Sequence, residues 1–318
     1  MIFVDTITIK NHTRQYDFNW GYIMAVLAFF SLAVKNSRTT GFVVAFLGAT
    51  LMSIDPIFIR FSGVSGFDTA FLFGLFSAIS MSILLKINDK RGIRKAIIQS
   101  GWPLLFTGML MLGSATGLVF SIKLTSITNT FVILSASPAV AAIFGWLLLR
   151  EKTSRSTIIA IISVMFGIGI VVSGSFSLGN WYGDALAVLS VICLSLMFTL
   201  LRKYEDVSRL ASVALGGLLL AVVMSFLVET SSYSANTWMI MAAMGLFTAP
   251  LGRVMSMVAT RYITAAEVSM TFMLETVLAP IWGFLFFSEI PTATSIIGGS
   301  IILVTIFIYT FITIKNDQ

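Results

Sequence analysis

SPAVAAIFGWLLLRE, from Ser137 to Glu151, returns 138 residues later as ETVLAPIWGFLFFSE, from Glu275 to Glu289. Most columns of the two stretches pair one apolar residue with another, and five columns are identical. The identical columns are Ala141/Ala279, Ile143/Ile281, Gly145/Gly283, Leu147/Leu285 and Glu151/Glu289. A repeat of this length predicts two copies of one structural unit.

The composition places the chain in a membrane. Of its 318 residues, 57% are hydrophobic and only 11% are charged, and the mean hydropathy is +0.97. A soluble domain carries roughly 25% charged residues because its surface faces water. The chain is therefore expected to be an integral membrane protein, in which the excess of basic residues reports topology rather than a nucleic-acid partner.

Ten apolar segments are long enough to cross a bilayer, which takes about 20 residues. They cover residues 42–60, 68–86, 102–122, 126–148, 156–174, 183–201, 210–228, 237–258, 264–287 and 293–314. Lys and Arg gather in four of the loops between these segments, at 86–100, 149–155, 202–209 and 259–263. Basic loops stay on the cytoplasmic side of a membrane, so both termini are predicted to be cytoplasmic, with the protein in the cell (inner) membrane.

The repeat predicts two five-helix halves, at 41–178 and 179–318, after an N-terminal extension at 1–40. Within the extension, residues 18–34 form an apolar segment that either spans the membrane or lies on its surface. Because each half has an odd number of helices, the second half enters the membrane from the opposite side. The fold class is thus an all-α membrane protein with two inverted repeats, an architecture typical of secondary transporters.

The repeat motifs also resemble a known family. They comprise Ser137–Glu151, Arg261-Tyr262 with Ala265–Glu267, Leu274–Glu289 and Gly298-Gly299. From about residue 41 onward, the chain is similar to the EamA family of the drug/metabolite transporter superfamily. The resemblance implies ten helices in two inverted halves and the export or exchange of small metabolites. One departure is Glu275-Thr276, where the family often has Glu-Pro.

Charged residues inside the spans are the first candidates for a site, because a charge at the bilayer centre costs at least about 2.5 kcal/mol. Glu275 lies near the middle of its span, so it is a candidate for binding a proton or a substrate cation. The alternative is a neutral acid that joins helices by hydrogen bonds. Arg253 is a candidate for an anionic substrate group or for pairing with Glu275, unless its side chain extends to the membrane surface.

Proline marks further candidates. Asp55 precedes Pro56, which removes a helix hydrogen bond and predicts a kink beside an acid. An ion pair of Asp55 with Arg60 is the alternative. The other expected breaks lie at Pro138, Pro250 and Pro280.

Trp146 and Trp282 lie within the two repeated helices, where each either lines a cavity or packs against lipid. Lys123 and Arg261 stand in matching places just before two of the spans, which favours anchors at the membrane surface. Glu151 and Glu289 end the repeated helices and are expected to be structural, for instance by capping a neighbouring helix.

These features favour a transporter of small organic metabolites that works by alternating access, with proton coupling as one option. The only histidine is His12 and the only cysteine is Cys193, so no metal site, cofactor or catalytic triad is expected. No Walker A pattern for ATP occurs. A non-transporting scaffold or sensor and an intramembrane enzyme are the alternatives. The sequence leaves the substrate and the oligomeric state open.

Overall fold

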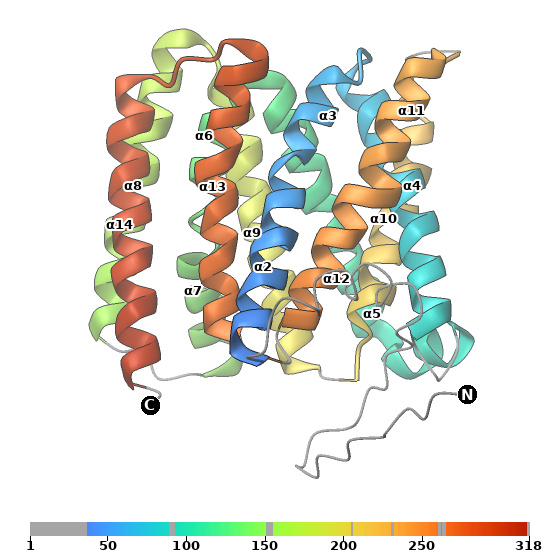
Figure 1. The fold of residues 1–318 in the computed structure, drawn as a ribbon, viewed down its shortest axis with the longest axis horizontal. Helices are drawn as coiled ribbons and strands as arrows, with labels where there is room; N and C mark the ends of the chain where they lie inside the picture. The colour runs from blue at the N-terminus through green and yellow to red at the C-terminus, as the bar shows by residue number, and fades with distance from the viewer. Residues whose placement is uncertain are drawn as a thin grey trace.

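The computed structural model describes residues 37–88, 93–150, 155–204, 206–229, 232–259, 262 and 265–316. The expected apolar segment at 18–34 lies outside these residues, as do Glu151 and Arg261. The described residues form helices joined by short connections, and these helices run between two ends of one bundle (Figure 1). We call these ends upper and lower, as they stand in Figure 1.

Within the described residues, ten segments cross the bundle, and three of them are built from more than one helix. The broken segments are α2 (Ser37–Ser53) with α3 (Asp55–Phe61), α6 (Ile127–Leu134) with α7 (Ser137–Leu149), and α11 (Ala235–Ala243) with η1 (Met244–Thr248) and α12 (Ala249–Ala259). The others are α4 (Gly66–Asn88), α5 (Ile93–Leu124), α8 (Arg155–Leu178), α9 (Trp181–Lys203), α10 (Arg209–Ser225), α13 (Ala265–Phe287) and α14 (Ala293–Asn316). Among the described residues, six of the segments have the length and hydropathy of a full membrane span, and four shorter apolar helices accompany them. The predicted all-α membrane architecture is confirmed.

The third segment begins earlier than the sequence predicts. Residues 102–122 were expected to span, whereas α5 starts at Ile93. The backbone leaves helical geometry at Gly101, with φ 57° and ψ −151°, just before Trp102 and Pro103. A glycine adopts this conformation at little cost, and proline starts the next helix. The predicted span therefore begins directly after a real break.

Serine side chains fix three of the helix starts. The hydroxyls of Ser126, Ser208 and Ser234 each accept a hydrogen bond from the backbone N–H three residues further on. The first turn of a helix has N–H groups without a backbone partner, so these caps stabilise α6, α10 and α11, typically by about 1 kcal/mol each.

The two repeated stretches end alike, at opposite ends of the bundle (Figure 1). Arg150 and Ser288 both have φ 54°, the left-handed conformation, and they are separated by the same 138 residues as the two stretches. The N–H of Arg150 binds the carbonyl of Gly145, and the N–H of Glu289 binds that of Gly283. Such left-handed caps satisfy the last carbonyls of a helix. The equivalence supports two inverted copies.

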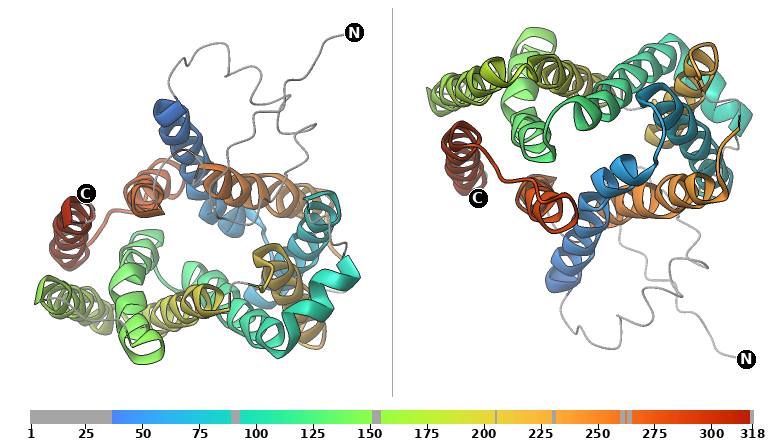
Figure 2. Two further views of the ribbon diagram at one scale, coloured as in Figure 1. Left: turned by 90° about the horizontal axis from the view of Figure 1, so that it is seen from below. Right: turned by 90° about the horizontal axis from the view of Figure 1, so that it is seen from above.

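The packing follows the same symmetry. The helix α5 of the first half packs on α9 of the second, and its counterpart α12 of the second half packs on α2 of the first. Likewise α7 packs on α9, and α13 packs on α2. Two further contacts, α4 with α10 and α8 with α14, join a helix to its own counterpart. Figure 2 shows both ends of this arrangement.

Candidate functional site

The break between α2 and α3 places an acid next to free backbone groups. Ile54 separates the two helices, and Pro56 lies at the start of α3. Because proline has no N–H, the carbonyl of Met52 lacks its usual helix partner. Asp55, the first residue of α3, thus stands beside an interrupted helix inside the bundle.

A second interruption faces this acid. The π-turn η1 ends at Thr248, directly before Ala249 and Pro250, so the extra residue of the turn adjusts the helix to the proline. The Thr248 hydroxyl donates to Oδ1 of Asp55 at 2.6 Å, with the carbonyl of Met244 as a weaker alternative at 3.3 Å. The sequence marked Pro250 but gave no sign of Thr248, because a threonine in a span is common and satisfies itself on its own helix.

The helix α13 completes the site from the other side of α2. Glu275 and Trp282 are seven residues apart, a spacing that places them on one helix face. The indole Nε1 of Trp282 donates to Oγ of Ser53 at 3.1 Å, and Ser53 donates to the carbonyl of Thr50 at 2.7 Å. Trp282 therefore binds the last residue of α2, next to the break.

Three charged side chains meet here. Arg253, on α12, interacts electrostatically with both Asp55 and Glu275. Nη1 of Arg253 and Oε1 of Glu275 are buried, and neither has a hydrogen-bond partner among the described residues. Nearly all buried polar groups in proteins are hydrogen-bonded. A buried donor on a cation and a buried acceptor on an acid, both unpartnered, are therefore available to a ligand or a proton.

The alternatives raised for two charges can now be compared with the structure. Arg60 does not pair with Asp55. Its guanidinium forms an ion pair with Glu289 at 2.8 Å, because the side chain points away from the start of α3 toward the end of α13. The guanidinium of Arg253 does not lie entirely at the membrane surface, because its Nη1 atom is buried.

The two tryptophans have different surroundings. Trp146 is 56% exposed on α7, so it faces out of the bundle and does not join the site. At the repeat offset Trp146 aligns with Phe284, which is also 56% exposed, whereas Trp282 aligns with Phe144. Two residues along a helix turn a side chain by about 200°, which accounts for the opposite directions of the tryptophans.

The remaining candidate prolines lie in α7 and α13. Pro138 follows the turn between α6 and α7, where Ser137 donates to the carbonyl of Leu134. In contrast, α13 continues as one helix across Pro280, so the expected break there is not seen. Among the described residues no group of three His, Cys, Asp or Glu side chains is placed to hold a metal ion.

Comparisons with known proteins agree with this architecture. A profile of the EamA-like transporter family matches residues 39–173 and 181–311. The Pseudopaline exporter CntI, from two strains of Pseudomonas aeruginosa, is 25% identical over 294 residues, which cover 89% of this chain and 93% of the exporter. A protein of known crystal structure has the same fold, with a TM-score of 0.61 and 14% identity over 86% of this chain and 98% of its own.

Proposed function

The chain belongs to the EamA-like transporter family, and from that premise we propose that Asp55, Arg253 and Glu275 form the site through which it moves a small organic molecule by alternating access. The observation that carries the proposal is the buried, unpartnered pair of Nη1 of Arg253 and Oε1 of Glu275. Charged groups without partners persist inside a membrane protein where they serve a substrate or ion path.

The position of these groups supports the same function. Asp55 belongs to the first half of the chain, and Arg253 and Glu275 belong to the second. Transporters with inverted repeats bind their substrates between the halves, at interrupted helices. Rocking of one half against the other then exposes such a site to each side in turn.

Glu275 is our candidate for proton coupling. Asp55 is held by the hydroxyl of Thr248, whereas Oε1 of Glu275 has no hydrogen-bond partner among the described residues. A proton on Glu275 would change the charge next to Arg253, and with it the affinity for a charged substrate. Proton binding and substrate binding are thereby linked.

Direction and orientation belong to the same proposal. At the lower end lie basic residues that include Lys86, Arg94, Lys95, Arg150, Arg155, Arg202, Lys203 and Arg209. Of the basic residues that the structure describes, only Arg60 and Lys123 lie at the upper end. The lower end is therefore assigned to the cytoplasm. The name of the relative from Pseudomonas aeruginosa supports export as the direction.

The test uses purified protein in liposomes that contain a pH-sensitive dye. A thermal-shift screen against a metabolite panel first selects compounds that stabilise the protein, since a ligand stabilises the state that it binds. Each selected compound is then added on one side, and proton movement is recorded. Wild-type protein should move protons only with its compound, and Glu275→Gln should abolish this movement.

The matched control is Glu229→Gln, the same chemical change on an exposed residue of the loop between α10 and α11. It should behave as wild type. Proton movement that is unchanged in Glu275→Gln would remove Glu275 from the coupling step. Failure of every compound to move through the wild-type protein would overturn the proposed function itself.

A further inference from the structure

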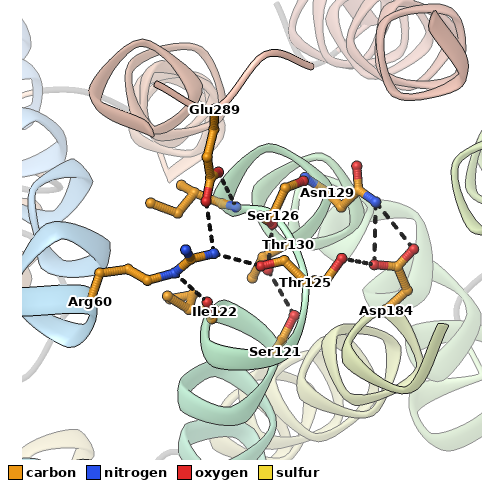
Figure 3. A network of polar contacts seen from close by, with 10 residues as sticks. Arg60, Ser121, Ile122, Thr125, Ser126, Asn129, Thr130, Asp184 and Glu289 are labelled. Atoms are coloured by element: carbon orange, nitrogen blue, oxygen red, sulfur yellow. Dashed lines mark hydrogen bonds and ion pairs between the residues drawn. The ribbon is translucent and has the colours of Figure 1, made fainter. Parts of the chain in front are cut away.

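An ion pair lies at the upper end of the bundle. Nη2 of Arg60 lies 2.8 Å from Oε1 of Glu289. The same guanidinium donates from Nε to the carbonyl of Ile122 at 2.6 Å and from Nη2 to the carbonyl of Thr125 at 2.7 Å (Figure 3). The planar guanidinium thus binds three acceptors on two different parts of the chain, which a flexible ammonium group does less well.

The second oxygen of Glu289 is also engaged. Its Oε2 accepts a hydrogen bond from the backbone N–H of Ile127 at 2.9 Å. Ile127 is the first residue of α6, where the helix dipole is positive and N–H groups lack partners. Glu289 is therefore held by an arginine and a helix start together. The side chains of Arg60 and Glu289 are only 25% and 16% exposed, so water competes weakly for these bonds.

These contacts join the two halves of the molecule. Arg60 lies on α3 and Ile127 on α6, both in the first half, whereas Glu289 follows α13 in the second. Just below, a Cβ on Gly283 would lie 3.5 Å from Cβ of Ile127, so α13 and α6 touch directly. The ring centroid of Phe61 lies 4.9 Å from that of Phe287, which adds an apolar contact between α3 and α13.

Further hydrogen bonds anchor the α6 side of these contacts. The Thr125 hydroxyl donates to Oδ1 of Asp184 on α9 at 2.7 Å. The amide nitrogen of Asn129 lies 3.3 Å from Oδ2 of the same acid (Figure 3). The Oδ1 of Asn129 accepts a hydrogen bond from the hydroxyl of Ser295 on α14. These bonds fix the start of α6 within the bundle. The partners that meet the start of α6 in these contacts lie on α3 and at the end of α13.

Both of these parts also reach the candidate site. Asp55 begins α3, and Arg60 lies five residues further on the same short helix. Glu275 lies on α13, twelve residues before its last residue, Phe287, which is about 18 Å along the helix axis. The break at Ile54 separates α3 from α2, while Ser62 ties the other end of α3 to Lys123 and Thr237. A tilt of α3 would therefore pivot about its Ser62 end. A change at the site then acts on the ion pair through two rigid helices.

We propose that Arg60 and Glu289 form the gate that closes the upper end of the transport path in this structure, and that this gate must open for the site to face that side. The gate rests on the proposed function, because only a transporter needs to open the bundle at one end. The gate is held by the ion pair between these two partly buried side chains and by the hydrogen bond from the start of α6 to Glu289.

The test measures access to a residue that the gate covers. In a Cys193→Ala background, Ile127→Cys places the only thiol at a fully buried position beneath the ion pair and leaves its backbone N–H in place. Intact cells and inverted vesicles are labelled with a membrane-impermeant maleimide, so that each face is probed separately. Adding Glu289→Gln removes the charge but keeps an acceptor for the start of α6.

Glu289→Gln should raise the labelling rate about tenfold from one face only, the change that about 1.4 kcal/mol produces. Arg60→Lys should raise the labelling rate less, because lysine keeps the positive charge but lacks the planar guanidinium that binds several acceptors at once. Glu229→Gln, on the same background, should leave the rate unchanged. If the Glu289→Gln protein does not fold into the membrane, the labelling rate of Arg60→Lys tests the gate instead.

An unchanged rate, or an equal rise from both faces with a lower unfolding temperature, would overturn the gate and assign the pair a structural role. Labelling needs no substrate and no transport. A missing gate and a missing transport activity are therefore distinguished.

Discussion

Replacing Arg253 by methionine tests whether the charged cluster of Asp55, Arg253 and Glu275 serves transport or only stabilises the fold. Methionine has nearly the length of the arginine stem and no charge, so Asp55 and Glu275 are left without their shared cation. Removing one partner from a buried ion pair costs about 3–5 kcal/mol. Here part of that loss is offset, since Nη1 of Arg253 has no hydrogen-bond partner and an unsatisfied buried donor costs about 1–3 kcal/mol.

The net expectation for Arg253→Met is a loss of about 2 kcal/mol in the free energy of unfolding. With about 3 °C for each kcal/mol, the unfolding temperature should fall by about 6 °C. Glu275→Gln should differ. Oε1 of Glu275 already lacks a partner, and the variant leaves Asp55 and Arg253 as a one-to-one pair, so stability should change by less than about 1 kcal/mol.

The assay is thermal unfolding of the purified protein in detergent, with proton-driven transport in liposomes measured on the same preparations. Both variants should lose transport, while only Arg253→Met loses stability. The opposite pattern, in which Glu275→Gln unfolds several degrees lower and still transports, would refute the reasoning. Glu275 would then join helices by hydrogen bonds and have no part in coupling.

Three further predictions concern stability in the same unfolding assay. Trp282→Phe should lower the free energy of unfolding by about 1 kcal/mol, because it removes the hydrogen bond to Ser53. Trp146→Phe, on the exposed face of α7, should leave the free energy of unfolding unchanged. Equal effects of the two variants would contradict the assignment of Trp282 to the site. Gly74→Ala should lower the free energy of unfolding by about 1–3 kcal/mol, since its Cβ would lie 2.7 Å from backbone atoms of α10. Gly169→Ala, whose Cβ would have nothing within 4 Å, should leave stability unchanged or raise it slightly. An unchanged stability of Gly74→Ala would disprove the close crossing of α4 and α10. Ser288→Gly should raise stability by about 1 kcal/mol by relieving the left-handed conformation, and a fall would show that the serine side chain matters more than its backbone.

Much of the fold follows from the sequence because lipid imposes a simple rule. A span needs a long apolar run, so hydropathy locates nine of the crossing segments to within a few residues, and the repeat fixes their opposite directions. The exception, the start of α5, arises because the helical residues 93–100 precede the break at Gly101 and are too polar to belong to the apolar run. Hydropathy does not contain that information.

The candidate site was predictable in part. Asp55, Arg253 and Glu275 are conspicuous because charges are costly in a span, and prolines mark two of the interrupted helices. Thr248 and Ser53 are not conspicuous in the sequence, because threonine and serine are frequent in spans and the partners of these two come from other helices. The pairing of Arg60 with Glu289 joins residues 229 positions apart, and only the packing of α3 against α13 brings them together.

The contacts of α4 with α10 and of α8 with α14 have a consequence for how such a chain arises. An interface in which a segment meets its own counterpart is the isologous interface of a two-fold homodimer. A single five-helix unit, inserted into the membrane in both orientations, would present the same two contacts, and the short connection at 179–180 would only tie the partners together. Gly74 lies against Gly217, and Gly167 against Gly298, so small residues let the two copies approach closely at these interfaces, while away from them each copy is free to specialise.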